Sequence, residues 1–180
     1  MRKIAGFVAV AVILGCAQAA ADPVVYQPEG CDFAVTFSAP PKRTLLKTLT
    51  NRGDAVLTYR AELQSDAAGK LTLLRAECTA IPRMGFVDDQ ILKGVMDQVG
   101  KDEKLKSPRS FFERNKLTGT VGRLRGRREI DSKDVTVELR RYFGDNTMLD
   151  VWIGAETDAY PPAEGDAFLK TITLKGKSLF

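Results

Sequence analysis

The stretch that decides the fold is Leu117–Glu156, LTGTVGRLRGRREIDSKDVTVELRRYFGDNTMLDVWIGAE, because apolar and polar residues alternate along three successive segments of it. Turn-forming residues separate the segments at Asp131–Asp134 and at Gly144–Thr147. Alternation with a period of two is typical of strands that bury one face. We therefore predict three consecutive antiparallel strands, the last of which runs to Ile153.

The first turn sets how the first two strands pair. A two-residue loop at Ser132–Lys133 and a four-residue loop at Asp131–Asp134 give the same register. In that register Arg125 lies opposite Arg140, and Arg127 lies opposite Glu138. The other face of the hairpin is mostly apolar, so we expect it to pack on the core.

The face that carries the arginines is open to two interpretations. Like charges directly opposite each other destabilise a sheet, roughly by a few tenths of a kcal/mol. The side chains of Arg125 and Arg140 therefore either extend apart into solvent or bind an anionic partner. Antiparallel sheets often leave one side in water, which favours a solvated face. Arginine equally suits an anion-binding surface, because its planar guanidinium binds phosphate or carboxylate with two hydrogen bonds. The candidate anion-binding residues are Arg123, Arg125, Arg127, Arg140 and Tyr142.

The N-terminus has the pattern of a secretory signal peptide, residues 1–21. A positive start, Met1–Lys3, precedes an uncharged apolar run, Ile4–Gly15, and small residues then offer cleavage sites. The run is shorter than the ~20 residues of a membrane-spanning helix. In a second interpretation, Ile13–Cys16 is a lipobox, and Cys16 is lipidated and anchors the protein to a membrane. We therefore expect a periplasmic or secreted protein, or alternatively a membrane-anchored lipoprotein.

The remaining residues, 22–180, are enough for one domain with a hydrophobic core. The whole chain has 27 Lys and Arg against 23 Asp and Glu, and removal of the signal peptide takes two of the basic residues away. So small an excess gives no case for nucleic acid as a partner. The charge is uneven, because Lys104–Arg128 holds nine basic residues and a single acid, Glu113. We interpret that segment as a local cationic region.

Cys31 and Cys78 are the two cysteines that follow the signal peptide. An even pair in an oxidising compartment predicts a disulfide bond. The alternative is two free thiols buried in the core, where cysteine behaves as a small apolar residue.

The rest of the chain predicts further strands and two helices. A helix at about residues 87–100 follows from a helical stripe of apolar residues and from a capping acid at Asp88 or Asp89. Gly94, within it, is expected to lie where the helix packs closely on the sheet, and Gly100 to cap its C-terminus. A short C-terminal helix is expected at Ala163–Lys170. The predicted strands outside the central stretch are Cys31–Phe37, Thr44–Thr50, Ala55–Leu63, Leu71–Ala80 and Thr171–Lys175, and Arg109–Lys116 is a short strand or a helical turn.

This order of elements predicts an α+β fold: a single domain made of a mostly antiparallel sheet, with the helices on one of its faces. The order resembles that of the PsbP/Mog1-like α/β/α sandwiches, through the Phe33–Phe37 strand and the following prolines, the mid-chain helix, the strand meander and the late Phe168–Leu169 helix. Members of that group are mostly non-catalytic accessory or binding proteins, and the resemblance implies such a role here.

The inventory of chemical groups is mostly negative. The chain has no histidine, which removes His-based triads and most zinc and haem sites. We expect no catalytic residue, no metal site and no cofactor, and we expect Trp152 to lie in the core. The function that fits best is a non-enzymatic bacterial cell-envelope protein that binds an anionic envelope component or a protein partner. The alternative is a carboxylate-dependent periplasmic hydrolase, which needs two carboxyl groups that converge in a cleft, about 5–10 Å apart.

Overall fold

The computed structural model describes residues 22–49, 53–67, 69–81 and 88–180, and the predicted signal peptide and Cys16 lie outside them. The chain forms one α+β domain, as predicted. Among the described residues, no helix is long and apolar enough to cross a membrane.

The elements are β1 Val24–Tyr26, β2 Phe33–Phe37, β3 Lys42–Leu49, β4 Ala55–Ala67, β5 Lys70–Ala80, α1 Asp89–Asp102, β6 Lys106–Asn115, β7 Gly119–Ile130, β8 Lys133–Phe143, β9 Thr147–Glu156, the 3-10 turn η1 Thr157–Ala159, α2 Ala163–Lys170, β10 Thr173–Leu174 and β11 Lys177–Ser178.

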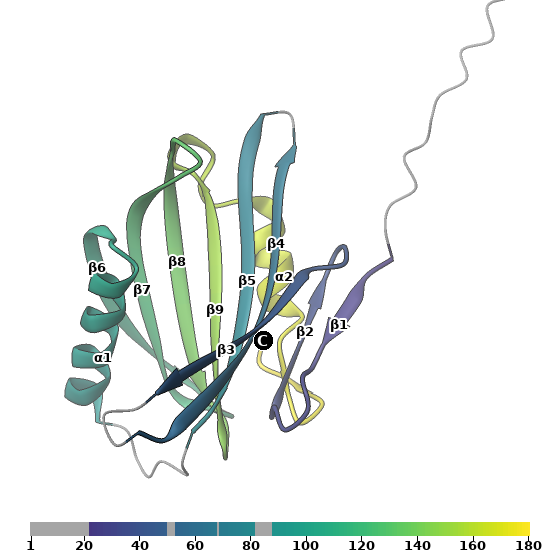
Figure 1. Ribbon diagram of the computed structural model, residues 1–180, viewed down its shortest axis with the longest axis vertical. Helices are drawn as coiled ribbons and strands as arrows, with labels where there is room; N and C mark the ends of the chain where they lie inside the picture. Colours follow the sequence, from purple (N-terminus) through teal and green to yellow (C-terminus); the bar gives the residue numbers. More distant parts are fainter. Residues whose placement is uncertain (1–21, 50–52, 68, 82–87) are drawn as a thin grey trace, which may run out of the picture.

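A seven-stranded antiparallel sheet forms the body of the domain, in the order β3-β4-β5-β9-β8-β7-β6. A smaller sheet, β1-β2-β10-β11, lies against it (Figure 1). The three strands predicted from the central stretch are β7, β8 and β9, and they occupy adjacent positions in the large sheet. Near the C-terminus, β11 pairs with β10.

The two helices lie on opposite faces of the large sheet, so the expectation that they share one face is wrong (Figure 1). Helix α1 covers β6 and β7 on one side. Helix α2 and the small sheet cover β4, β5 and β9 on the other. A strand that buries apolar residues on both faces needs other elements packed against each face. Strand β9 is an example, because Val151 lies in the core on the α2 side and Trp152 lies in the core on the α1 side. Each helix therefore contacts only some of the strands on its face of the sheet.

The register of the β7–β8 hairpin differs from the prediction by two residues. Its loop is Asp131–Ser132, and both residues have positive φ, 49° and 63°. This is the pattern of a type I′ turn, whose twist matches that of the flanking strands. Ile130 therefore pairs with Lys133. A shift of two keeps every side chain on its predicted face, since side chains alternate with a period of two.

Helix α1 begins after the predicted cap, because the side chain of Asp88 accepts a hydrogen bond from the backbone N–H of Gln90. It runs two residues beyond the predicted end, and Gly100 is buried inside it rather than capping it. The prediction for Gly94 is wrong, because nothing lies within 4 Å of the position of a Cβ there. The close approach to the sheet uses a glycine of β7 instead: a Cβ on Gly122 would meet the sulfur of Met96 at 3.1 Å.

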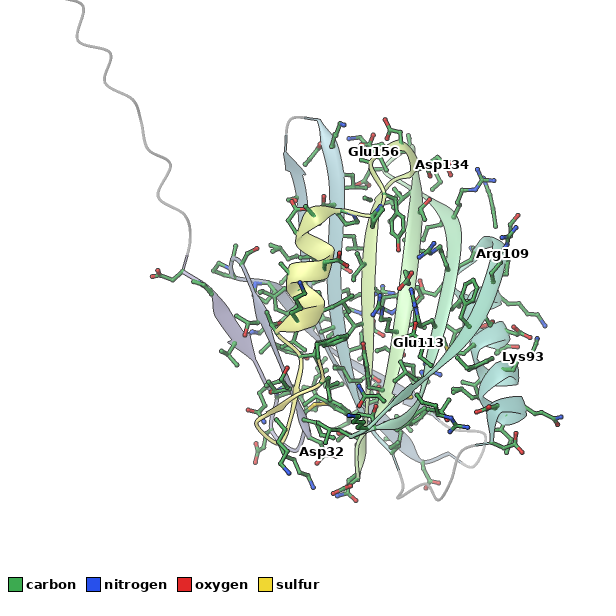
Figure 2. All side chains as sticks on the ribbon, turned by 180° about the vertical axis from the view of Figure 1, so that it is seen from behind. Asp32, Lys93, Arg109, Glu113, Asp134 and Glu156 are labelled. Carbon is green, nitrogen blue, oxygen red and sulfur yellow. A yellow bond between two sulfur atoms is a disulfide. The ribbon has the colours of Figure 1, made fainter. Side chains whose placement is uncertain are left out.

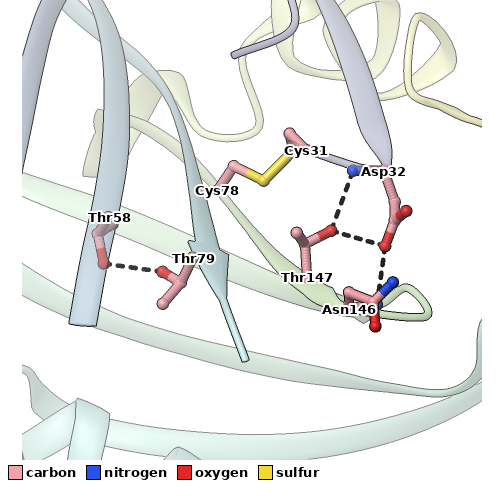
Figure 3. The surroundings of a disulfide bond; sticks show 7 residues. All are labelled: Cys31, Asp32, Thr58, Cys78, Thr79, Asn146 and Thr147. Carbon is pink, nitrogen blue, oxygen red and sulfur yellow. Dashed lines mark hydrogen bonds between the residues drawn. A yellow bond between two sulfur atoms is a disulfide. The ribbon is translucent and has the colours of Figure 1, made fainter. Parts of the chain in front are cut away.

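The predicted disulfide is confirmed, and it joins the two sheets. Cys31 and Cys78 form the bond with their Cα atoms 6.3 Å apart. Next to it, the Asp32 carboxylate accepts hydrogen bonds from the hydroxyl of Thr147 and from the backbone N–H of Asn146, each at 3.0 Å (Figure 3). The start of β2 is therefore fixed both to β5 and to the loop that leads into β9.

Candidate functional site

The candidate arginines lie on the α2 face of the sheet, on β8 and β7, which follow in the sheet after β9, the strand that α2 contacts. Arg123 and Arg125 project from β7, and Arg140 projects from β8. Figure 2 shows this side of the molecule, with α2 over part of the sheet and with Arg109 and Glu113 on the strand beyond it. The two-residue change of register places Arg123, not Arg125, directly opposite Arg140.

Glu138 lies at the centre of the cluster and separates the cations. Its side chain is only 3% exposed. Oε1 accepts from Arg123 Nη2 at 2.8 Å and from Arg140 Nε at 2.9 Å. Oε2 accepts from Arg125 Nε at 3.0 Å and Nη2 at 2.6 Å. A carboxylate between two facing guanidinium groups removes the repulsion that their opposition would otherwise cause.

Tyr160 closes the cluster from the side of α2. Its hydroxyl donates to Glu138 Oε2 at 3.1 Å, and its ring lies under the guanidinium of Arg125, 5.2 Å from ring centre to Cζ. Burial raises the pKa of the Tyr160 hydroxyl to about 12, so it stays a protonated donor at neutral pH. The arginine hollow that results has a volume of about 220 Å³ and is lined by Arg123, Arg125, Glu138, Arg140, Ile153, Tyr160, Pro161, Pro162, Gly165, Asp166 and Leu169.

Opposing effects set the charge of the hollow. Burial raises the pKa of Glu138, but the hydrogen bond from Arg125 and the positive charges of Arg123 and Arg140 outweigh it, so the pKa ends below its ordinary value. Glu138 is therefore an anion at neutral pH. Three guanidiniums face two carboxylates, since Asp166 also lines the hollow. Within the lining the guanidiniums outnumber the carboxylates by one, and Glu113, at the outer edge, pairs with Arg123 and supplies a third negative charge.

The hollow also has more hydrogen-bond donors than acceptors. Each guanidinium carries about five N–H groups, and Glu138 accepts one from Arg123, two from Arg125 and one from Arg140. Arg123 also reaches Glu113 at the outer edge, yet its Nε is buried and has no hydrogen-bond partner among the described residues. Arg125 remains 46% exposed. The arrangement can therefore accept a small oxyanion or a carboxylate group.

Two of the five candidate residues lie outside the hollow. Tyr142 is 2% exposed and packs in the core, 6.5 Å from the ring of Phe33; it follows Arg140 on the same face of β8 but does not line the hollow. Arg127 is one row further along β7 and forms an ion pair with Asp134 at 3.8 Å. The sequence analysis did not single out Tyr160. It also missed the central position of Glu138, which the wrong register had placed opposite Arg127.

A second polar region lies on the other side of the sheet, in a groove of about 430 Å³ between β3, β4 and α1. Glu77 and Asp150 line it and face each other across β5 and β9. Both oxygens of Asp150 accept from Arg141, at 2.7 and 2.6 Å, and Glu77 accepts from Arg60 at 2.5 Å. Two carboxylates thus meet in a groove, but arginines already hold both of them.

The fold and the arginine hollow define a class of protein: a single-domain antiparallel α+β protein with a buried carboxylate inside an arginine cluster. No described protein family, no curated protein and no solved structure matches this chain. The resemblance to the PsbP/Mog1-like group therefore stays a prediction. In the described part of the chain, no group of three or more acidic or Cys side chains could hold a metal ion.

Proposed function

We propose that this protein is a non-enzymatic binding module of the bacterial cell envelope that holds an anionic group of its partner in the arginine hollow. One observation carries the proposal: three guanidiniums converge on a single buried carboxylate and keep more N–H donors than it can accept. Arg125 is the exposed member that a ligand would meet first. The partner is an anionic envelope component or a protein with an acidic face.

The proposed location is the periplasm or the exterior, with lipid anchoring at Cys16 as the alternative. The pattern of the N-terminus supports export. The Cys31–Cys78 disulfide is compatible with it, because disulfides persist in oxidising compartments. The mass of the protein isolated from the producing bacterium distinguishes a chain that begins near Asp22 from one that begins at a lipidated Cys16.

Cosedimentation with a bacterial envelope fraction tests the binding. Arg125→Glu should weaken binding of the chain about tenfold, because it reverses the charge of the exposed guanidinium. Arg127→Glu, outside the hollow, should weaken it less. The matched control is Arg114→Glu, which changes the net charge equally but lies beside α1, paired with Asp89. Equal losses in Arg125→Glu and Arg114→Glu, with both variants folded, would contradict the proposal.

A carboxylate-dependent hydrolase is the second candidate, and Glu77 is the observation that favours it. Burial raises the pKa of Glu77 although the positive charges of Arg75 and Arg60 oppose the shift, and a carboxyl with a raised pKa suits a general acid. Its neighbour Asp150 would supply the second carboxylate. Turnover of p-nitrophenyl esters or glycosides that is lost in Glu77→Gln and kept in Arg125→Glu would favour this candidate, and no turnover of either substrate class would remove it.

A further inference from the structure

Among the residues that the structure describes, strand β3 is a free edge of the large sheet, and it lacks two of the features that protect such edges, a bulge and a proline, although it carries three basic residues. It pairs with β4 on one side only. Its register with β4 runs without a bulge from Lys42 to Leu49, and no proline interrupts it. The opposite edge, β6, has both a register break and Pro108. Bulges and prolines are among the common devices against strand addition, so β3 is the more accessible edge.

One face of β3 alternates cations and exposed leucines. Arg43, Leu45, Lys47 and Leu49 share the face of the sheet on which α2 lies. Leu45 is 56% exposed and Leu49 is 65% exposed. A further exposed leucine, Leu57, is the partner of Lys47 on β4. The apolar positions of the edge are therefore uncovered in the described part of the chain.

Two of the three cations of β3, Arg43 and Lys47, form no ion pair with the residues that the structure describes, whereas Lys42 lies opposite Glu62 and Glu29 lines the same hollow as Arg43. Arg43 lies opposite Ala61 and Lys47 lies opposite Leu57, so neither meets an acid across the strands. The recorded contact of the Arg43 guanidinium is with the ring of Tyr26, 5.9 Å from its centre. Strand β3 contains three basic residues and no acid. Pairing with β3 of a second copy would therefore place like charges beside one another, which is unfavourable. Residues 1–21 contain no acid either.

A hollow beside β3 could receive a side chain. It measures about 350 Å³ and is lined by the start of β3, by β1 and by the turn after β1, including Tyr26, Arg43 and Leu45. Tyr26 is 5% exposed, and its hydroxyl has no hydrogen-bond partner in the described structure. Backbone hydrogen bonds along an edge supply affinity in strand addition, and adjacent pockets supply specificity.

We propose that β3 binds an extended peptide segment of a partner protein, added as an extra strand, in which acidic and apolar side chains alternate along one face. The acids face Arg43 and Lys47, and the apolar side chains cover Leu45 and Leu49. This surface lies on a different strand from the arginine hollow, so the proposal does not depend on the proposed function.

Two synthetic peptides test the proposal by fluorescence anisotropy with the full folded chain. One has the sequence Glu-Thr-Val-Thr-Glu-Thr-Val, and the other has lysine in place of both glutamates. The glutamate peptide should bind at least about tenfold more tightly than the lysine peptide. In the double variant Arg43→Glu, Lys47→Glu the preference should reverse. Arg114→Glu is the control and should leave the preference unchanged, because Arg114 lies on β6.

Two further measurements separate strand addition from general attraction of charge. N-methylation of alternate peptide bonds should weaken binding, and the bound peptide should slow amide hydrogen exchange in β3. Equal binding of both peptides, no binding up to about 1 mM, or protection confined to other strands would overturn the proposal. Dimerisation of the chain that is lost in Leu45→Lys would also overturn it, in favour of a second copy as the occupant.

Discussion

At Glu138, burial and charge act in opposite directions. A carboxylate that is 3% exposed loses most of its hydration, which raises its pKa, but three arginines and a tyrosine hydroxyl replace the lost water. The effect of the arginines is larger than that of burial, so the pKa of Glu138 is lowered. The residue is therefore both the counterion that allows the arginines to converge and the group whose removal would leave them facing one another.

Glu138→Gln should destabilise the protein by about 2 kcal/mol at pH 7, because the arginines lose a charged acceptor. A carboxyl whose pKa is depressed in the folded state contributes stability above its unfolded pKa and loses it as the pH falls. The difference in unfolding free energy between wild type and variant should therefore shrink as the pH falls below about 4.5, the ordinary value of the group. Denaturant unfolding from pH 7 to pH 3 measures it. A difference that stays constant would mean that Glu138 is not held as an anion.

At the scale of the element, glycines decide how closely helices approach the sheet. A Cβ on Gly165 of α2 would lie 2.7 Å from Cγ2 of Ile153, a buried β-branched side chain with little room to move. Gly94 of α1 faces open space. Helix propensity alone would treat both positions in the same way, because alanine is the better helix former at each.

The two substitutions to alanine should therefore have opposite effects. Gly94→Ala should stabilise the protein by about 0.5–1 kcal/mol, since it gains propensity without a clash. Gly165→Ala should destabilise it by about 1–2 kcal/mol, because Ile153 must shift. Urea unfolding of both variants measures the two changes. Stabilisation of similar size in both would show that α2 is not seated closely on β9.

These local contacts explain how far the sequence could predict the structure. Strands with clear alternation, such as Phe33–Phe37, and the helix Ala163–Lys170 match the structure closely, because their signals are contained within a few residues. The hairpin register was wrong because the choice between Asp131–Ser132 and Ser132–Lys133 as the loop depends on backbone twist, which residue types indicate only weakly. Tyr160 was missed because its partner, Glu138, is distant in sequence.

At the scale of the whole molecule, the disulfide and the core on the α2 face join the small sheet to the large one. Phe33, Val35 and Phe37 of β2 are fully buried against the large sheet. The covalent link from Cys31 to Cys78 spans 47 positions of sequence. A link across so long a loop restricts the unfolded chain more than a short one would.

Removal of the link in the double variant Cys31→Ser, Cys78→Ser should lower the free energy of unfolding by about 3–4 kcal/mol. The fold itself should persist, because the β2 contacts and the Asp32 hydrogen bonds remain. Chemical denaturation with and without reductant measures the difference. Mass spectrometry before and after reduction provides the control, and a wild-type chain with two free thiols would contradict the account.

The central claim, that the arginine hollow receives an anionic group, is tested most directly by nuclear magnetic resonance of the arginine Nε–H signals during titration with inorganic phosphate. The signals of Arg123, Arg125 and Arg140 should shift and saturate, whereas those of Arg114 and Arg141, which pair with Asp89 and Asp150, should stay in place. Chloride at equal ionic strength should shift none of these five signals. Shifts that are absent, or equal in all five arginines, would contradict the claim.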